Sequence, residues 1–313
     1  MKDYRILITG AAGSIGSELA RQLVKKKPER LLLLDQDETG IFNISQELEG
    51  STPFVADITN RERIEEIFEQ YRPDFVFHAA AYKHVPLMEA QVIEAVRNNI
   101  FGTLNVVNAA VKYDVKKFVF ISTDKAVNPS SIMGATKRVG EMICQCQNAT
   151  TGTRFVSVRF GNVLDSRGSV LPTWRKLIAE GKPIMVTHPK MERYFMTIEN
   201  AVKLVIEAVN IGKGGEIFVF DMGKPKNILK LAKEIVKESG KKVEIVIGEP
   251  RPGEKLSEEL LTGNEIATKH KKIFIIEPEE VDEELLEECL EELQTRKNIR
   301  ETLKVLIPNY NYE

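Results

Sequence analysis

The sequence predicts an α/β fold with a doubly wound parallel sheet and a smaller C-terminal lobe, on three observations. Apolar runs typical of buried strands alternate with amphipathic helical segments through the first half of the chain, a pattern that places helices on both faces of a parallel sheet. A glycine-rich loop joins the first predicted strand to the first predicted helix. Beyond about residue 165 the regular alternation ends, and glycine, proline and polar residues cluster in turns.

Composition excludes several classes of protein. The chain has 313 residues, 42% of them hydrophobic, which is enough for a large core and more than one lobe. A net charge of −2 argues against binding to nucleic acid or a membrane surface. Since no apolar run approaches a membrane span and the N-terminus has no signal-peptide pattern, we expect a cytoplasmic protein with no membrane span in this chain. The spacing of Cys144, Cys146 and Cys289 predicts free thiols and no metal site.

The first strand, predicted over residues 4–9, runs into a G-x-x-G-x-x-G loop ahead of a helix predicted over 17–26. Glycines let the backbone turn tightly and approach a pyrophosphate, which the free N–H groups of a helix N-terminus bind. In this strand–loop–helix setting the motif predicts a Rossmann-like dinucleotide site. Its candidate cofactor-binding residues are Thr9, Gly10, Gly13, Ser14, Ile15 and Gly16.

The next two predicted strands each end at an acidic residue. Residues 30–34 lead to Asp35, about 20 residues beyond the glycine loop, where a carboxylate can hold the adenosine ribose hydroxyls. A carboxylate there repels a 2′-phosphate, so NAD is favoured as cofactor and NADP is possible. The alternative is that Asp35 only caps the next helix. A third strand, over 53–56, leads to Asp57 and Ile58, which we expect near the adenine.

A fourth strand, over residues 74–78, leads into a stretch of small residues that allows backbone to lie close to a cofactor. These residues are Ala79, Ala80 and Ala81. Lys83 and His84 follow on a loop at the same sheet edge. We expect His78 and His84 to be structural or substrate-contacting rather than catalytic. A long helix is predicted over 92–113, and its Asn99 is a further candidate cofactor-binding residue.

The chemistry is expected at the fifth strand, which begins at Phe118. It ends in the polar residues Ser122, Thr123, Asp124 and Lys125. A turn and a helix over 132–148 follow, and the helix carries Met133 and Lys137. Open α/β sheets bind their ligands at the carboxyl ends of parallel strands. These residues are therefore the candidate catalytic group.

We expect a dinucleotide-binding domain over residues 1–165, including the active-site strand and helix, and a mainly substrate-binding lobe over 166–313. Some segments of the second unit are expected to return to the sheet. A loop over 249–255 carries Arg251 and Lys255, whose side chains suit phosphate groups. Residues 279–306 are charged, with apolar residues on one side, which predicts an amphipathic surface helix.

Several blocks of the sequence together resemble the extended short-chain dehydrogenase/reductase superfamily. Within it, they are similar to the polysaccharide-biosynthesis branch that contains UDP-N-acetylglucosamine 4,6-dehydratases. The blocks are the glycine loop, AAYKHVPLME, STDKAVNPSSIMGATK, VRFGNVLDSRGSV, THPKMERYFMT and RPGEK. Retaining members of this family often carry an N-terminal membrane region, so this chain is expected to be a soluble version or only the catalytic part.

The resemblance implies NAD-dependent 4,6-dehydration of a UDP-N-acetylhexosamine for surface polysaccharide biosynthesis, with retention at C5 favoured. Oxidation at C4 makes the C5 proton acidic, water leaves across C5–C6, and hydride returns to C6. By resemblance, Asp124 is the acid at the C6 oxygen and Lys125 is the C5 base. We expect burial and nearby positive charge to keep Lys125 partly neutral.

One residue departs from the superfamily pattern. The usual active-site tyrosine, four residues before the lysine, is replaced by Met133, which cannot transfer a proton. Thr123, hydrogen-bonded to Asp124, is therefore the candidate C4 base, with Asp124 itself second, and Lys137 is expected to hold the nicotinamide ribose. The resemblance also implies a homo-oligomer and a UDP-sugar substrate held by Lys83, Asn162, Arg193, Arg251 and Glu254.

Three alternatives remain open: a C5-inverting dehydratase, a nucleotide-sugar 4-epimerase, and a non-catalytic dinucleotide sensor. Epimerases of this superfamily normally keep the tyrosine, so Met133 argues against that activity. Inverting dehydratases share the methionine. The dense polar group at residues 122–125 argues against a sensor.

Overall fold

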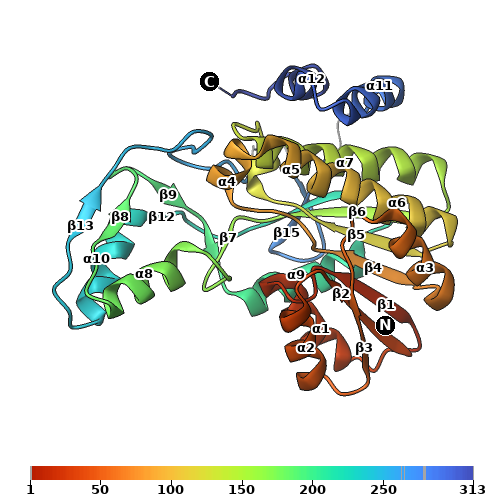
Figure 1. Ribbon diagram of the computed structural model, residues 1–313, viewed down its shortest axis with the longest axis horizontal. Coiled ribbons are helices and arrows are strands. Elements are labelled where there is room, and N and C mark those ends of the chain that lie inside the picture. The colour runs from red at the N-terminus through yellow and green to blue at the C-terminus, as the bar shows by residue number, and fades with distance from the viewer. Residues whose placement is uncertain (1, 262, 264, 278–279, 313) are drawn as a thin grey trace.

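The computed structural model describes residues 2–261, 263, 265–277 and 280–312. Within these ranges the largest sheet has nine strands. They are β1 (Arg5–Thr9), β2 (Arg30–Asp35), β3 (Ser51–Val55), β4 (Phe75–His78), β5 (Lys117–Ile121), β6 (Arg154–Arg159), β11 (Ile217–Phe220), β14 (Ile266–Ala267) and β15 (Ile273–Ile276). The spatial order is β14-β15-β11-β6-β5-β4-β1-β2-β3, and β15 runs antiparallel to both its neighbours. The predicted α/β fold is confirmed (Figure 1).

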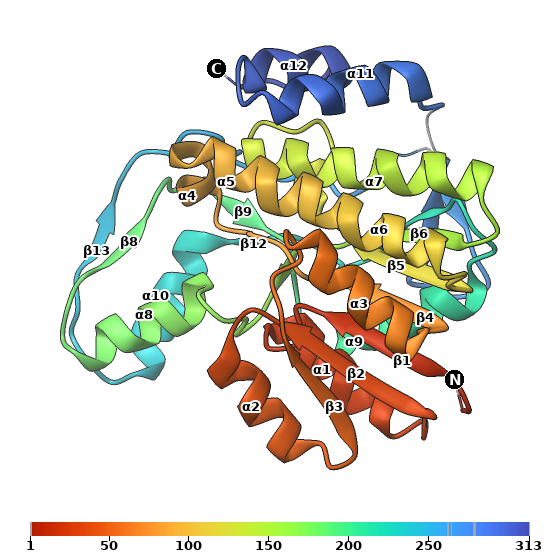
Figure 2. The same ribbon diagram turned by 45° about the vertical axis from the view of Figure 1, so that its right-hand side comes forward.

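Helices cover both faces of this sheet. One face packs against α1 (Ser14–Val24), α2 (Glu38–Glu47) and α9 (Ile198–Ile211). The other packs against α3 (Arg61–Tyr71), α6 (Thr103–Lys112) and α7 (Ile132–Thr150) (Figure 2). Because successive side chains of a strand point to opposite faces, Ile6 and Ile8 join the first core and Leu7 joins the second. The central strands are therefore mostly apolar and buried, as in other sheets buried on both sides.

The long helix predicted over residues 92–113 contains a π-helical turn. It consists of α5 (Val92–Val96), a π-helical segment Arg97–Gly102, and α6. Short π-helical turns inside α-helices often occur at functional sites, and here the turn buries Asn99 completely. A further short helix, α4 (Val85–Ala90), stands just before it, where the sequence suggested only a loop.

The charged C-terminal segment forms two helices, α11 (Glu283–Gln294) and α12 (Ile299–Leu306). Glu279, the expected first residue of this segment, lies outside the described residues. Both helices lie along α7 (Figures 1 and 2), and Leu286, Cys289 and Leu293 are buried in the same core as α7. The prediction of an amphipathic surface helix is confirmed for α11, whose apolar side is covered by its own chain.

The second lobe contains α8 (Val170–Ala179), α10 (Ile228–Glu238) and three two-stranded sheets. The strand pairs are β7 (Asn162–Val163) with β10 (Phe195–Met196), β8 (Ile184–Val186) with β13 (Ile245–Ile247), and β9 (Glu192–Arg193) with β12 (Lys226–Asn227). An apolar cluster around Trp174 forms its core. The boundary at residue 165 stays a prediction. No helix in the described part of the chain is long and apolar enough to cross a membrane.

Candidate active site

A cleft of about 1030 Å³ opens between the large sheet and the second lobe. The predicted site residues that line it are Gly10, Gly13, Ser14, Ile15, Gly16, Asp35, Ala79, Ala81, Lys83, His84, Thr123, Lys125, Met133, Lys137 and Asn162. Those that do not line it are Thr9, Asp57, Ile58, Ala80, Asn99, Asp124, Arg193, Arg251 and Glu254. The structure thus brings the glycine loop, the end of β5 and the start of α7 to one cavity.

The glycine loop packs closely against neighbouring backbone of the same chain. Gly10 has a φ of +69°, and a Cβ on it would lie 2.6 Å from the backbone nitrogen of Ala80. A Cβ on Gly16 would lie 2.1 Å from the carbonyl oxygen of Gly10. Helix α1 begins after Gly13 without a side-chain cap, so N–H groups of its first turn are available to an anion. These features fit the pyrophosphate of a dinucleotide.

The carboxylate of Asp35 is held at the cleft by two backbone groups. Its Oδ2 accepts a 3.0 Å hydrogen bond from the N–H of Ala12, and its Oδ1 accepts one of 3.0 Å from the N–H of Asp37. The cap of α2 is Asp37, which accepts from the N–H of Gly40. The alternative interpretation of Asp35 as the helix cap is therefore wrong. Both carboxylates line the cleft.

Residues 165–168 form a loop that crosses from the second lobe to the glycine loop, and we call them the crossing loop. The backbone N–H of Arg167 donates to Ser14 Oγ at 2.8 Å, and its guanidinium pairs with Asp37 at 2.5 Å. Hydrogen bonding to this guanidinium lowers the pKa of Asp37. In the same loop, the hydroxyl of Ser166 lies 3.5 Å from the ammonium of Lys83. The sequence marked this loop only as a turn, because its partners are remote in the chain.

A buried chain of hydrogen bonds supports the cleft wall. Thr9 Oγ1 lies 2.7 Å from Nδ1 of His78, whose Nε2 lies 3.0 Å from Thr103 Oγ1. Thr103 donates in turn to the carbonyl oxygen of Asn99 at 2.7 Å, and the Asn99 amide bonds the backbone of Tyr82. Burial lowers the pKa of His78 to about 3, so the ring is neutral. The structural interpretation of His78 is confirmed. Thr9 and Asn99 belong to the same hydrogen-bonded chain and support the cleft without lining it.

Asp57 and Ile58 stand at the end of β3, apart from the cleft lining. The carboxylate of Asp57 accepts from the N–H of Thr59 and lies 3.6 Å from the guanidinium of Arg97. The Ile58 side chain is buried against Gly102 of the π-helical segment. Their part in adenine binding stays a prediction.

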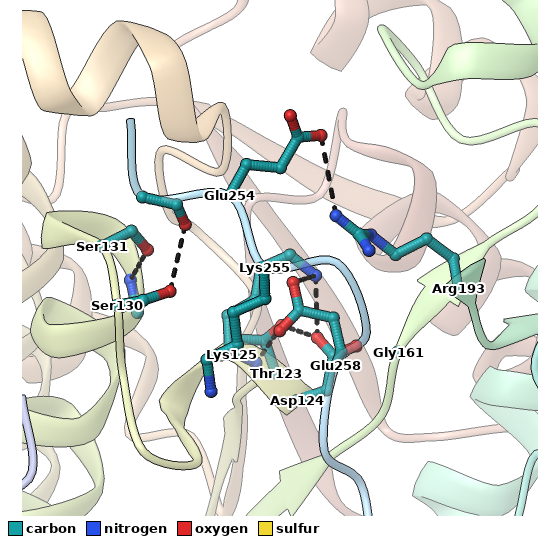
Figure 3. A network of polar contacts seen from close by, with 12 residues as sticks. Thr123, Asp124, Lys125, Ser130, Ser131, Gly161, Arg193, Glu254, Lys255 and Glu258 are labelled. Atoms are coloured by element: carbon teal, nitrogen blue, oxygen red, sulfur yellow. Dashed lines mark hydrogen bonds and ion pairs between the residues drawn. The ribbon is translucent and has the colours of Figure 1, made fainter. Parts of the chain in front are cut away.

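At the end of β5, one carboxylate oxygen receives two donors. Thr123 Oγ1 donates to Asp124 Oδ1 at 2.8 Å, and Lys125 Nζ donates to the same oxygen at 2.9 Å (Figure 3). Asp124 is fully buried, and its Oδ2 lacks a hydrogen-bond partner among the described residues. Thr123 and Lys125 line the cleft and Asp124 does not. Asp124 is therefore separated from the cleft by the two neighbours that donate to it.

A second carboxylate, Glu258, lies beside Lys125. Its Oε1 is 3.5 Å from Lys125 Nζ, and the residue is buried. Burial lowers the pKa of Lys125, but the charges of Asp124 and Glu258 outweigh it, and the net pKa is raised. The expectation of a partly neutral Lys125 is therefore wrong for the protein without ligand, because two carboxylates surround the amine. No pattern in the sequence pointed to Glu258.

Met133 and Lys137 lie one turn apart on α7, and both line the cleft. Ser131 caps this helix by accepting from the N–H of Gly134 at 3.1 Å. The ammonium of Lys137 lies 4.0 Å from the ring centroid of Phe120. Burial lowers the pKa of Lys137 to about 8. This lysine is thus charged at neutral pH and close to losing its proton.

A buried ion pair lies next to Ser122, at the end of β5. Arg159 donates to both oxygens of Glu141, at 2.7 and 2.6 Å. Ser122 Oγ donates to Glu141 Oε1 at 2.6 Å. These contacts hold the polar end of β5 against α7 and occupy the hydroxyl of Ser122. Sequence reasoning assigned no role to either charged residue, although Arg159 lies in the block VRFGNVLDSRGSV.

The residues expected at the substrate fall into two groups. Lys83, His84 and Asn162 line the cleft, and Asn162 Oδ1 is buried without a hydrogen-bond partner among the described residues. The second group lies outside the cleft lining. There, Glu254 lies 3.6 Å from the guanidinium of Arg193 and accepts a 3.2 Å bond from the backbone N–H of Arg251. The cleft-lining group thus offers an unused acceptor, while the second group is held together by Glu254.

In the described ranges, no three His, Cys, Asp or Glu side chains are grouped to hold a metal ion. Cys144, Cys146 and Cys289 are buried free thiols. Burial raises the pKa of Cys146 to about 11, so this thiol stays protonated at neutral pH.

Comparison with known proteins decides the family. The sequence matches the family described as "Polysaccharide biosynthesis protein" over residues 6–278. The chain belongs to this family. It is 51% identical to the capsular polysaccharide biosynthesis protein CapD of Staphylococcus aureus, over 88% of this chain and 48% of CapD. It is 37% identical to the UDP-N-acetylglucosamine 4,6-dehydratase (inverting) of Campylobacter jejuni, over 83% of this chain and 78% of that enzyme.

Two solved structures share the fold. The X-ray structure of Pen from Bacillus thuringiensis is 36% identical, with a TM-score of 0.83 over 88% of this chain and 89% of Pen. The UDP-glucose 4-epimerase of Thermus thermophilus, solved with NAD, is 25% identical, with a TM-score of 0.75 over 82% of this chain and 90% of that one. The chain therefore belongs to the short-chain dehydrogenase/reductase group that contains nucleotide-sugar dehydratases and epimerases, as the motifs predicted. It spans about half the length of CapD.

Proposed function

We propose that this enzyme is a UDP-N-acetylglucosamine 4,6-dehydratase that uses NAD and forms a UDP-4-keto-6-deoxy sugar for surface polysaccharide biosynthesis. The observation that carries the proposal is the hydrogen-bonded group of Thr123, Asp124 and Lys125 in the cleft that the glycine loop also lines. Dehydration needs both an acid and a base beside the sugar. The Campylobacter jejuni relative, which is named as a UDP-N-acetylglucosamine 4,6-dehydratase, supports 4,6-dehydration.

NAD, when bound, would supply the hydride transfer that links C4 and C6 of the sugar. The glycine loop would hold its pyrophosphate, Asp35 its adenosine ribose, and Lys137 its nicotinamide ribose. A carboxylate at Asp35 disfavours the 2′-phosphate of NADP. The NAD in the related epimerase structure supports this choice.

The residues of the chain would move the protons. Thr123 accepts the proton of the C4 hydroxyl while it passes its own proton to Asp124, which its 2.8 Å hydrogen bond favours. Asp124 returns this proton through Thr123 to the C6 oxygen, which leaves as water. Lys125 takes the C5 proton and gives it back on the same face, which retains the configuration. Lys83, His84 and Asn162 would bind the UDP-sugar in the cleft, with Arg193, Arg251 and Glu254 supporting its nucleotide end.

Two other reactions have specific support. The Campylobacter jejuni relative is named as an inverting dehydratase, which favours inversion at C5. The Thermus thermophilus relative is named as a UDP-glucose 4-epimerase, which favours 4-epimerisation. Against epimerisation, Met133 replaces the tyrosine that epimerases of this superfamily normally use. We also propose a cytoplasmic location, because three free thiols suit a reducing compartment, and a homo-oligomer, which the family resemblance implies.

Incubation of the purified protein with UDP-N-acetylglucosamine and NAD tests the reaction. Mass spectrometry should show the loss of one water from the sugar nucleotide. An unchanged mass with an altered sugar spectrum would mean epimerisation, and proton NMR in deuterated water distinguishes retention from inversion at C5. Asp124→Asn and Lys125→Ala should each abolish dehydration and leave NAD bound. Near-normal turnover in both variants would contradict the assigned roles.

A further inference from the structure

Glu258 is a buried carboxylate that the mechanism above leaves without a role. It lies beyond β13, in the part of the second lobe that follows the Arg251 loop. Its side chain is 4% exposed, and its Oε1 lies 3.5 Å from Lys125 Nζ. The Lys125 ammonium therefore sits between Asp124, from its own loop, and Glu258, from the other lobe (Figure 3).

Three charged groups face Lys125 from the elements around it. The carboxylates of Asp124 and Glu258 favour its charged form, and the guanidinium of Arg193 on β9 opposes it. Despite burial, the net effect of these charges is to raise the pKa of Lys125. A protonated amine has no lone pair with which to remove the C5 proton. The proposed elimination therefore requires that Lys125 first lose one proton to a neighbouring group.

Asp124 cannot take this proton at that stage. In the proposed mechanism it already holds the proton of the C4 hydroxyl, received through Thr123. Glu258 is the remaining carboxylate in contact with the amine. We propose that Glu258 is a positioning residue that accepts one proton from Lys125 during the elimination and returns it at the end of the cycle. This inference rests on the proposed function.

The protons balance in this cycle. An N–H bond of Lys125 breaks as an O–H bond forms on Glu258, which leaves a neutral amine facing the cleft. Lys125 then takes the C5 proton, while the proton held by Asp124 leaves with the C6 oxygen as water. Lys125 gives its proton back to C5 as hydride reaches C6. Glu258 finally returns its proton to Lys125, and the resting charges are restored.

The loop that carries Glu258 is attached to both sides of the site, which fixes the carboxylate relative to the amine. Ser130 Oγ donates to the carbonyl oxygen of Gly253 at 3.1 Å, and Lys255 Nζ donates to that of Val127 at 3.2 Å. On the second lobe, the N–H of Glu192 donates to the carbonyl oxygen of Leu256 at 2.9 Å. The position of Glu258 therefore depends on contacts with both lobes.

Glu258→Gln tests the proposal, since it removes the charge and keeps the shape. Glu259→Gln is the matched control, because Glu259 is the next residue and its half-exposed side chain faces Asn128 and Lys255 instead. We expect kcat for dehydration by the wild type and by Glu259→Gln to change little around neutral pH. In Glu258→Gln the proton must leave to solvent, so kcat should rise about tenfold per pH unit toward alkaline pH until Lys125 is neutral, whereas the wild-type profile stays flat.

The shape of the profile separates this role from a merely structural one. If the pH profile of kcat for Glu258→Gln is parallel to that of the wild type, whatever its absolute kcat, the proposal is overturned. Glu258→Asp keeps the charge and should restore the flat profile, and it serves as the test if the glutamine variant does not fold. Circular dichroism and NAD binding establish that each variant is folded.

A measurement without substrate separates the inference from the proposed reaction. Reductive methylation with ¹³C-formaldehyde followed by NMR titration reports the pKa of each lysine, and Lys125→Arg assigns the signal. Glu258→Gln should lower the pKa of Lys125, while Glu259→Gln should leave it unchanged. An unchanged Lys125 pKa in Glu258→Gln overturns the inference. A wild-type protein that leaves UDP-N-acetylglucosamine intact contradicts the proposed function instead.

Discussion

The hydroxyl of Thr123 donates a 2.8 Å hydrogen bond to Oδ1 of Asp124, a carboxylate that is completely buried. Thr123 lines the cleft and Asp124 does not. The threonine is thus a connection between a buried proton acceptor and any hydroxyl group that enters the cavity. This arrangement offers a route for the C4 proton in a site where Met133 replaces the usual tyrosine.

Thr123→Val should lower the rate of dehydration by roughly 10²–10³-fold, within the usual range for the loss of a general acid or base. Valine keeps the branched shape but cannot relay a proton. The reduced cofactor, followed by its near-ultraviolet absorbance in a single turnover, should form correspondingly slowly, while NAD binding is retained. Thr123→Ser is the control and should keep most of the activity. Equal rates for the serine and valine variants would exclude the relay.

The lowered pKa of Lys137 predicts that the stability of the folded protein depends on pH. Burial lowers its pKa from 10.5 to about 8. Below pH 8 the folded and unfolded states both carry the proton, and the folded state bears the cost of burying the charge. Between about pH 8 and 10.5 the unfolded state binds more protons, so the stability contributed by this residue rises with pH. Lys137→Met should therefore be more stable than the wild type at pH 7, by up to about 3 kcal/mol.

Urea unfolding of the cofactor-free proteins across pH 7–10 checks this prediction. The difference in unfolding free energy between Lys137→Met and the wild type should shrink as the pH rises. A difference that stays constant over this range would mean that Lys137 titrates at its ordinary pKa.

Arg167 should slow the release of the cofactor, because its crossing loop bridges the second lobe to Ser14 and Asp37. Its side chain is 73% exposed, and exposed ion pairs contribute little. We therefore expect Arg167→Ala to speed NAD dissociation by only about two- to fivefold at low salt. The difference should diminish at high salt, where screening weakens the pair.

Arg175→Ala is the matched control, since Arg175 pairs with Asp165 of the same loop and does not line the cleft. Stopped-flow fluorescence of NAD release measures both variants. Similar dissociation rates for the two alanine variants would show that the contact with Asp37 has no role in retaining the cofactor.

Gly10→Ala should strongly destabilise the protein and abolish NAD binding. The added Cβ would lie 2.6 Å from backbone of the neighbouring strand end, and the residue has a φ of +69°. Gly50→Ala is the control: it also has a positive φ, of +83°, but nothing lies within 4 Å of the added Cβ. It should cost only about 1–2 kcal/mol in backbone strain. Thermal unfolding and NAD titration compare the two, and equal stability losses would contradict the close-approach argument.

Much of the fold was predictable from the sequence, because it depends on short-range rules. The strand–loop–helix pattern around Gly10 is set by backbone sterics that act within a few residues. The stretch from Thr123 to Lys137 is similarly local, with a polar strand end, a turn and a capped helix in succession. The interruption of the helix over residues 92–113 was not predictable, because the π-helical turn depends on how its buried residues pack.

What the sequence by itself determined is the α/β class, the dinucleotide loop and the chemical identity of the candidate catalytic group. Only the tertiary structure decided how these groups are charged and held. Glu258 beside Lys125, and Arg167 beside Asp37, join parts of the chain that no local pattern relates. Coulomb interactions depend on distance in space and on burial, so the protonation of Lys125 depends on Glu258, which only the fold brings near, as well as on its sequence neighbour Asp124.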